Sequence, residues 1–68
     1  MNVTVNGKPA TMADGATVAD VVRALTGTVE PRGVAGARGG TVVPRWAWPA
    51  TGLVDGDRIE VLTATQGG

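Results

Sequence analysis

The sequence contains neither cysteine nor histidine in its 68 residues, which excludes several kinds of site at the outset. Without cysteine the chain forms no disulfide and offers no thiol nucleophile. Without histidine, and without acidic residues at ligand spacing, it lacks the usual ligands of a transition metal. It has no serine-centred motif either. We therefore expect no catalytic residues, no metal site and no bound cofactor on this chain.

The charged residues are scattered along the chain, and its apolar runs are short. Six basic and six acidic residues give a net charge of zero, and they occur singly. No basic patch for nucleic acid or a membrane surface results. The apolar runs are too short to span a bilayer, and the N-terminus lacks the pattern of a signal peptide. We expect one small soluble domain in the cytoplasm, with neither nucleic acid nor membrane as a partner.

The N-terminal part of the chain predicts a β-hairpin. Residues 2–6 alternate polar and apolar, which is typical of a half-buried strand. Asn6-Gly7 then favours a type I′ turn, because this turn needs positive φ at both central residues. The return strand runs through Ala10–Met12, and Pro9, which has no N–H to donate, makes it an edge strand. Asp14-Gly15 closes the unit as a turn.

A helix is predicted next. Thr17 is a typical N-cap, and Asp20 provides a short-armed version of the capping box. One apolar stripe then follows at helical spacing: Val18, Val21, Val22 and Leu25. Gly27 can take the left-handed conformation that ends a helix.

The middle of the chain predicts a second hairpin, with strands at 34–38 and 41–43 around Gly39-Gly40. Its glycines do not form a phosphate-binding loop, because no Lys-Ser/Thr pair and no helix follow them. Residues 44–48 predict one helical turn that begins with Pro44 at its first position and ends at Pro49. Trp46 and Trp48 cannot share one face of it, so we expect one to be buried and the other exposed.

The last strand is the most regular one. After a tight turn at 55–57, the run 58–64 places Ile59, Val61 and Thr63 on one face. The other face carries Arg58, Glu60 and Leu62. With the first and last strands as a central parallel pair, the chain is an α+β protein of the β-grasp (ubiquitin-like) type. Its mixed sheet of four to five strands packs on one helix, with a short helical turn in addition.

The chain ends in a bare Gly67-Gly68 after two short polar residues, Thr65 and Gln66. Glycine has no Cβ, so such a tail can enter a narrow site and approach a phosphate closely. We expect residues 1–64 to form the domain and 65–68 a flexible tail that threads into partner enzymes. The carboxylate of Gly68 is then the group that is chemically modified.

These residues resemble the ThiS family, the small sulfur carriers of thiamin thiazole biosynthesis. The resemblance runs end to end, through Asn6-Gly7, Asp14–Val18, Val42-Val43-Pro44-Arg45-x-x-Trp48, Asp55–Val61 and Gly67-Gly68. The chain departs from the family where Arg38-Gly39-Gly40 replaces an Asn-Gly type turn, and in Pro49 and Gly52 after Trp48. These departures concern turn geometry and leave the tail unchanged.

The resemblance implies a route and a set of partners. A ThiF-like adenylyltransferase uses ATP to form an acyl-adenylate at Gly68, and a sulfur donor such as a cysteine desulfurase converts it to a thiocarboxylate. A ThiG-like thiazole synthase then takes the sulfur. This chain is a substrate of those enzymes and not an enzyme itself. For docking, Leu62 on the outer sheet face is the expected apolar anchor, with Arg58 and Glu60 at its polar rim.

Three alternatives remain open from the sequence. The Gly-Gly end is shared with MoaD, the molybdopterin carrier, and with ubiquitin-like proteins generally. The chain could therefore carry sulfur in another pathway, or be joined to lysines as a protein modifier. It could also be a plain binding domain whose tail has no role.

Overall fold

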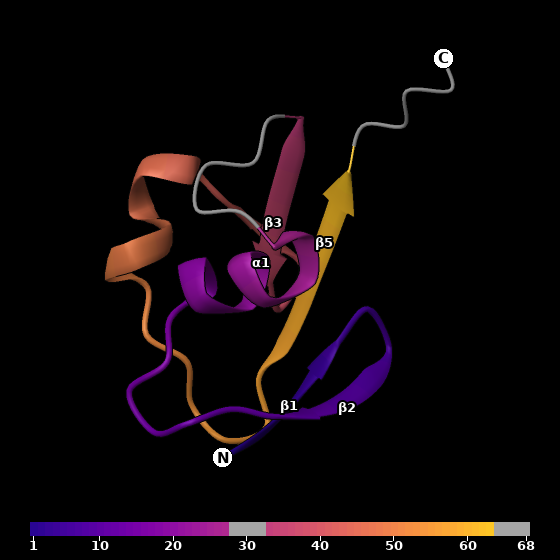
Figure 1. Cartoon of the computed structure of the whole chain (residues 1–68), viewed down its shortest axis with the longest axis vertical. Coiled ribbons are helices and arrows are strands. Elements are labelled where there is room, and N and C mark those ends of the chain that lie inside the picture. The colour runs from indigo at the N-terminus through magenta and orange to yellow at the C-terminus, as the bar shows by residue number, and fades with distance from the viewer. Residues whose placement is uncertain (28–32, 64–68) are drawn as a thin grey trace.

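The computed structural model describes residues 1–27 and 33–63. Their elements, in chain order, are β1 (Asn2–Val5), β2 (Lys8–Thr11), α1 (Val18–Thr26), β3 (Val34–Arg38), β4 (Thr41–Val43), the 3₁₀ helix η1 (Arg45–Ala50) and β5 (Arg58–Thr63). The strands form one five-stranded sheet in the order β2-β1-β5-β3-β4, and α1 crosses one of its faces (Figure 1). This arrangement confirms the predicted β-grasp fold.

The sheet is built around β5. It runs parallel to β1 in the register Val5 opposite Ile59, and antiparallel to β3 on its other side. The parallel pairing of the first and last strands was predicted and is confirmed. The hairpin strand β2 lies at one edge of the sheet, as expected from Pro9, and β4 lies at the other.

Local turn chemistry produces both hairpins as predicted. Asn6 and Gly7 have φ values of 52° and 82°, as a type I′ turn requires. Gly39 and Gly40, at 57° and 87°, make the turn between β3 and β4. Positive φ at both positions of each pair explains why glycine or asparagine is needed there.

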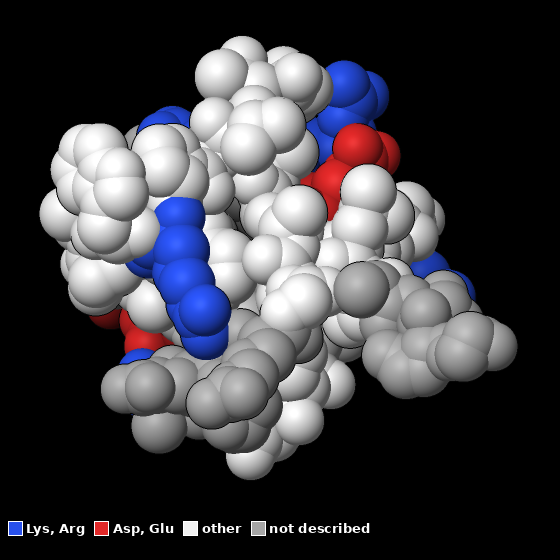
Figure 2. All heavy atoms as spheres, turned by 90° about the horizontal axis from the view of Figure 1, so that it is seen from above, with Lys and Arg blue, Asp and Glu red and all other residues white. Residues whose placement is uncertain are grey.

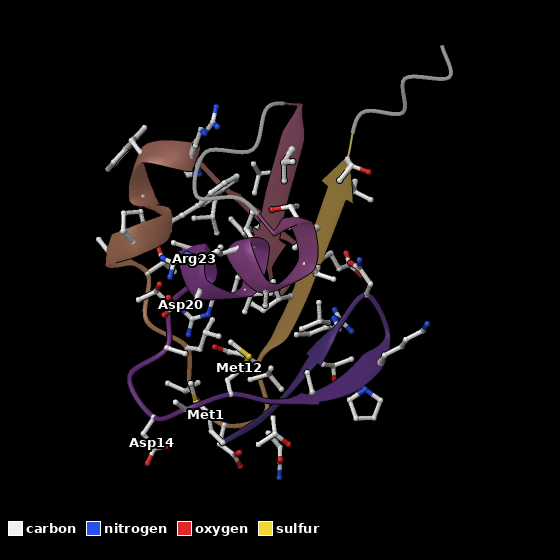
Figure 3. All side chains as sticks on the ribbon, in the orientation of Figure 1. Met1, Met12, Asp14, Asp20 and Arg23 are labelled. Atoms are coloured by element: carbon white, nitrogen blue, oxygen red, sulfur yellow. The ribbon has the colours of Figure 1, made fainter. Side chains whose placement is uncertain are left out.

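Both ends of α1 are capped as the sequence predicts. The N–H of Asp20 donates to Thr17 Oγ1 (3.3 Å), and the N–H of Thr17 donates to Asp20 Oδ2 (2.9 Å). At the other end Gly27 is left-handed, with φ 76°, and its N–H donates to the carbonyl of Arg23. On the surface of the helix Asp20 and Arg23 form an ion pair at 3.6 Å, and Figure 3 shows the two residues close together on α1.

The core lies between the inner face of the sheet and the helices. Its buried residues are Val3, Ala16, Val18, Val21, Val22, Trp48, Leu53, Ile59 and Val61. Leu25 was predicted to complete the helix stripe, and this is wrong, since it is 51% exposed. Its angle on the helix is that of the stripe, but it lies in the last turn of α1, outside the cluster of core residues.

The helical turn differs from its prediction in two details. Pro44 is the N-cap and not the first helical residue, and η1 runs through Pro49 to Ala50 instead of ending there. The fixed φ of proline is close to that of a 3₁₀ helix, so Pro49 fits inside so short a segment. The structure settles which tryptophan is buried: Trp48 is 4% exposed and Trp46 is 82% exposed.

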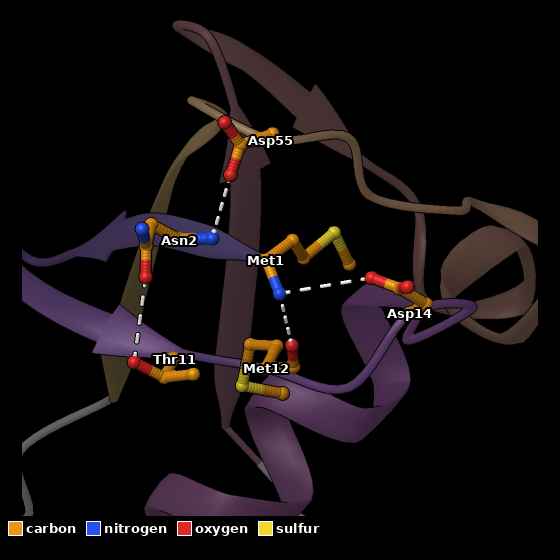
Figure 4. A network of polar contacts seen from close by, with 6 residues as sticks. All are labelled: Met1, Asn2, Thr11, Met12, Asp14 and Asp55. Carbon is orange, nitrogen blue, oxygen red and sulfur yellow. Dashed lines mark hydrogen bonds and ion pairs between the residues drawn. The ribbon is translucent and has the colours of Figure 1, made fainter.

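Hydrogen bonds join the start of β1 to the end of β2 on one side and to the turn before β5 on the other (Figure 4). The Met1 amine donates to the carbonyl of Met12 at 2.7 Å, and the hydroxyl of Thr11 donates to Asn2 Oδ1 at 3.4 Å. The N–H of Asn2 donates to Asp55 Oδ1 at 2.7 Å. Since Asp55 belongs to the turn that precedes β5, these bonds fix where the central strand begins.

Candidate functional site

The candidate site is the C-terminal half of β5 together with the sheet face around it. The last described residue of this strand is Thr63. The predicted tail residues Thr65, Gln66, Gly67 and Gly68 lie outside the described part of the chain, as do Ala64 and the loop of 28–32. The boundary between domain and tail therefore stays a prediction. What the structure gives is the surface from which the tail starts.

The facing of β5 is confirmed. Ile59 and Val61 are 0% and 5% exposed, whereas Leu62 is 69% exposed. Arg58 and Glu60 are exposed on the same outer face as Leu62. The structure thus brings together the three residues predicted for docking, on one side of the central strand.

An apolar strip extends from Leu62 across the next two strands. The strand register places Ala35 opposite Leu62, Ala37 opposite Glu60, and Val42 opposite Ala37. Residues directly opposite in an antiparallel pair share a sheet face, so all lie on the outer face. Val42 is 70% exposed. We call Leu62, Ala35, Ala37 and Val42 the outer apolar strip. Sequence reasoning missed its β3 and β4 members, because the register that joins them is a tertiary property.

A shallow hollow adjoins the strip at the end of β5. It measures about 400 Å³ and is lined by Gly33, Val34, Ala35, Leu62 and Thr63. Its walls are the start of β3 and the end of β5, which pair as Val34 opposite Thr63. The hollow therefore lies directly beside the point where residues 64–68 continue from the strand.

Few charges surround this surface. Arg38 Nε lies 3.1 Å from Asp57 Oδ2, and the same oxygen accepts a bond from the N–H of Val54. This ion pair stabilises the start of β5 and lies away from its C-terminal end. On the side shown in Figure 2, Lys, Arg, Asp and Glu appear as isolated groups among uncharged residues. Within 1–27 and 33–63, no group of His, Cys, Asp and Glu is placed to hold a metal.

None of the helices in the described ranges is long and apolar enough to cross a bilayer.

Asn6 has a role that sequence reasoning missed. Asn6 Nδ2 donates to the carbonyl of Val61 at 3.1 Å, and the N–H of Val61 donates to Asn6 Oδ1 at 2.8 Å. The only sequence signal was an asparagine at a hairpin turn, where the turn itself accounts for the residue.

The fold and the site define a small β-grasp protein with an apolar sheet face beside its C-terminal strand. The model of the ThiS family matches residues 3–68, which includes Gly67-Gly68. The chain belongs to the ThiS family and is a sulfur carrier of the ThiS type.

Solved structures agree with this assignment. The chain is similar to the crystal structure of the thiamine biosynthesis protein ThiS from Geobacter metallireducens, at 38% identity and a TM-score of 0.78, over 100% of both chains. It is likewise similar to a solution structure of a thiamine biosynthesis protein from the same organism, at 38% identity and a TM-score of 0.79. That match covers 100% of this chain and 88% of the other. A comparison with curated proteins found no match.

Proposed function

We propose that this chain carries sulfur for thiamin thiazole formation, as a thiocarboxylate on Gly68. The observation that carries the proposal is the match to the ThiS family through Gly68, on a chain whose last strand presents an exposed apolar residue, Leu62, on its outer face. The chemistry belongs to the partners, and this chain supplies the carboxylate and the docking surface.

In the first step a ThiF-like adenylyltransferase binds the chain and ATP. A carboxylate oxygen of Gly68 attacks the α-phosphorus of ATP, the bond to the β-phosphate oxygen breaks, and pyrophosphate leaves. The product is an acyl-adenylate, a mixed anhydride with a good leaving group. In the second step a sulfide equivalent attacks the acyl carbon and AMP leaves, which yields the thiocarboxylate. With glycine at this position no side chain obstructs either attack.

In the last step a ThiG-like thiazole synthase takes the sulfur. The cell supplies the sulfide equivalent through a donor such as a cysteine desulfurase. ATP is a substrate of the adenylyltransferase, and this chain binds no cofactor of its own.

The outer apolar strip supports the docking part of the proposal. Leu62 is the apolar anchor, with Arg58 and Glu60 at the rim of the contact. Residues 64–68 span at most about 17 Å when fully extended. The partner's reaction centre therefore lies within that distance of Thr63, so the partner must cover the surface around the end of β5. The hollow beside Leu62 gives an apolar side chain of the partner a place to pack.

Intact mass spectrometry tests the proposal directly. The purified chain is incubated with a ThiF-type enzyme and ATP, and a mass increase equal to AMP is expected. Addition of sulfide should then replace one oxygen by sulfur. A chain that ends at Gly67 is the matched control, and it should yield much less of either product. If neither product forms with an enzyme that is active on its own carrier, the proposal is wrong.

A further inference from the structure

The side-chain amide of Asn6 makes the hydrogen bonds to β5 that the next residue of β1 would make if the strand continued. This strand ends at Val5, and the chain turns away at Asn6, whose φ is 52°. Up to that point backbone bonds join β1 to β5: the N–H of Thr4 donates to the carbonyl of Asp57, and that of Asn6 to the carbonyl of Ile59, both at 2.9 Å.

The amide of Asn6 continues this series by one step along β5. Both its donor and its acceptor bond the backbone of Val61, at 3.1 Å and 2.8 Å. A side-chain amide has the same pair of groups as a peptide unit, so it can replace one in a ladder of strand hydrogen bonds. The bonded residues are thus Asp57, directly before β5, and Ile59 and Val61 within it, the alternate positions whose backbone groups point towards β1.

The bonded residue lies next to the site. Val61 precedes Leu62, the proposed docking anchor, and β5 ends soon afterwards at Thr63. From its other side this part of β5 is held by β3, where Gly36 and Ala35 lie opposite Val61 and Leu62. With the Asn6 amide, hydrogen bonds hold the end of β5 on both sides. Without it, only the pairing with β3 remains.

We propose that Asn6 is a positioning residue for the reaction at Gly68, because its amide holds the end of β5, from which the chain continues to Gly68. This inference rests on the proposed function. Ordering one backbone residue costs conformational entropy worth roughly tenfold in an equilibrium constant. If the end of β5 loosens back to Val61, the partner must order Leu62 and Thr63 when it binds.

Two substitutions at Asn6 separate the amide from the turn. Asn6→Gly removes the side chain but accepts a left-handed φ without strain. Asn6→Asp keeps a residue that suits the turn and an oxygen that accepts from the Val61 N–H. It also sets a second oxygen against the Val61 carbonyl, where Asn6 had a donor.

The matched control is a substitution at Thr51, outside the sheet. Thr51→Val also removes a partly buried bond from a side chain to the backbone, that of Thr51 Oγ1 to the carbonyl of Ala47 at 2.7 Å. It does so at the end of η1, in a segment that is not part of the sheet. All variants are assayed at a temperature where each is fully folded, so that global stability does not affect the rates.

The measurements are amide hydrogen exchange at Val61 and kcat/KM for adenylation by a ThiF-type enzyme. Asn6→Gly should speed exchange at Val61 and lower kcat/KM about tenfold to 100-fold, given the cost of ordering the two loosened residues Leu62 and Thr63. Asn6→Asp should lower kcat/KM at least as much, whereas Thr51→Val should match the wild type.

Several results would overturn the inference. Asn6→Gly could react like the wild type, or Thr51→Val could lose as much. Asn6→Asp could retain full activity, which would reduce Asn6 to a turn residue. Faster exchange at Val61 with unchanged kcat/KM would show a purely structural contact. If the wild-type chain itself forms no adenylate, the proposed function is wrong, and the proposed role of Asn6, which depends on it, is wrong as well.

Discussion

Truncation of Leu62 tests the docking surface, and its effect can be worked out from exposure. Leu62 is 69% exposed, so about two thirds of the side chain is available for burial by a partner. Full burial of a leucine is worth about 1.5–3 kcal/mol, which leaves roughly 1–2 kcal/mol for Leu62. Leu62→Ala should therefore weaken binding of the adenylyltransferase about fivefold to thirtyfold. Because so little of the side chain is buried in the free protein, its free energy of unfolding should fall by less than about 1 kcal/mol.

Leu62→Asp is the stronger variant. It loses the same apolar contact and also brings a carboxylate into the contact, where it is dehydrated without a partner. We expect a loss of affinity on the order of 100-fold or more, a fall in the rate of adenylation, and an intact fold.

The chain offers a matched control in Leu25. It is the same residue type, is 51% exposed, and lies on α1 across the sheet from the strip. Leu25→Ala and Leu25→Asp should leave affinity for the adenylyltransferase unchanged. Calorimetric titration and thermal unfolding of all four variants give the two quantities needed. Equal losses at Leu25 and Leu62, or wild-type binding by Leu62→Asp, would place the docking face elsewhere.

Three further outcomes are expected. Gly67→Val should bind the adenylyltransferase nearly normally but form little adenylate, because the added branch obstructs the threaded tail and not the docking face; equal losses in affinity and rate would contradict this. Gly36→Ala should lower the free energy of unfolding by about 1–2 kcal/mol, because a Cβ there would lie 3.3 Å from Trp48 Nε1 in a well-packed core. An unchanged Tm would show that the indole can shift freely. Thr17→Ala should lower the free energy of unfolding by about 1 kcal/mol through loss of the N-cap, and Thr17→Ser should retain most of the wild-type stability. If the serine variant is as unstable as the alanine variant, the bond between the hydroxyl and the N–H of Asp20 is not the cause.

Features set by neighbouring residues could be predicted from the sequence. The Asn6-Gly7 turn and the capping box of Thr17 each need only a few adjacent residues, and both occur as expected. The facing of β5 follows from strict alternation between Ile59 and Leu62, because a strand with one buried face has a single permitted register. The predicted docking residues of β5 share a face for the same reason.

Features that depend on distant partners could not be predicted. Ala35 and Val42 join Leu62 only through the register of β3 and β4, which no local pattern encodes. The spacing of Trp46 and Trp48 requires one to be exposed but does not say which. The structure buries Trp48, whose Nε1 donates to the carbonyl of Val43 at 2.9 Å and lies over Gly36, where a Cβ is absent.

The two faces of the sheet show why so small a chain can both fold and present a surface. Its core residues lie on the side of the helices, and no element among the described residues covers the outer face. That outer face is not uniform. On β1 it carries the polar Asn2 and Thr4, whereas on β5, β3 and β4 it carries the outer apolar strip. An exposed apolar surface of this kind contributes little to the stability of the free chain, and such patches commonly mark binding surfaces. Because β5 contributes Leu62 to the strip and the chain continues from this strand to Gly68, the proposed function predicts that a partner which covers the strip also receives the carboxylate of Gly68.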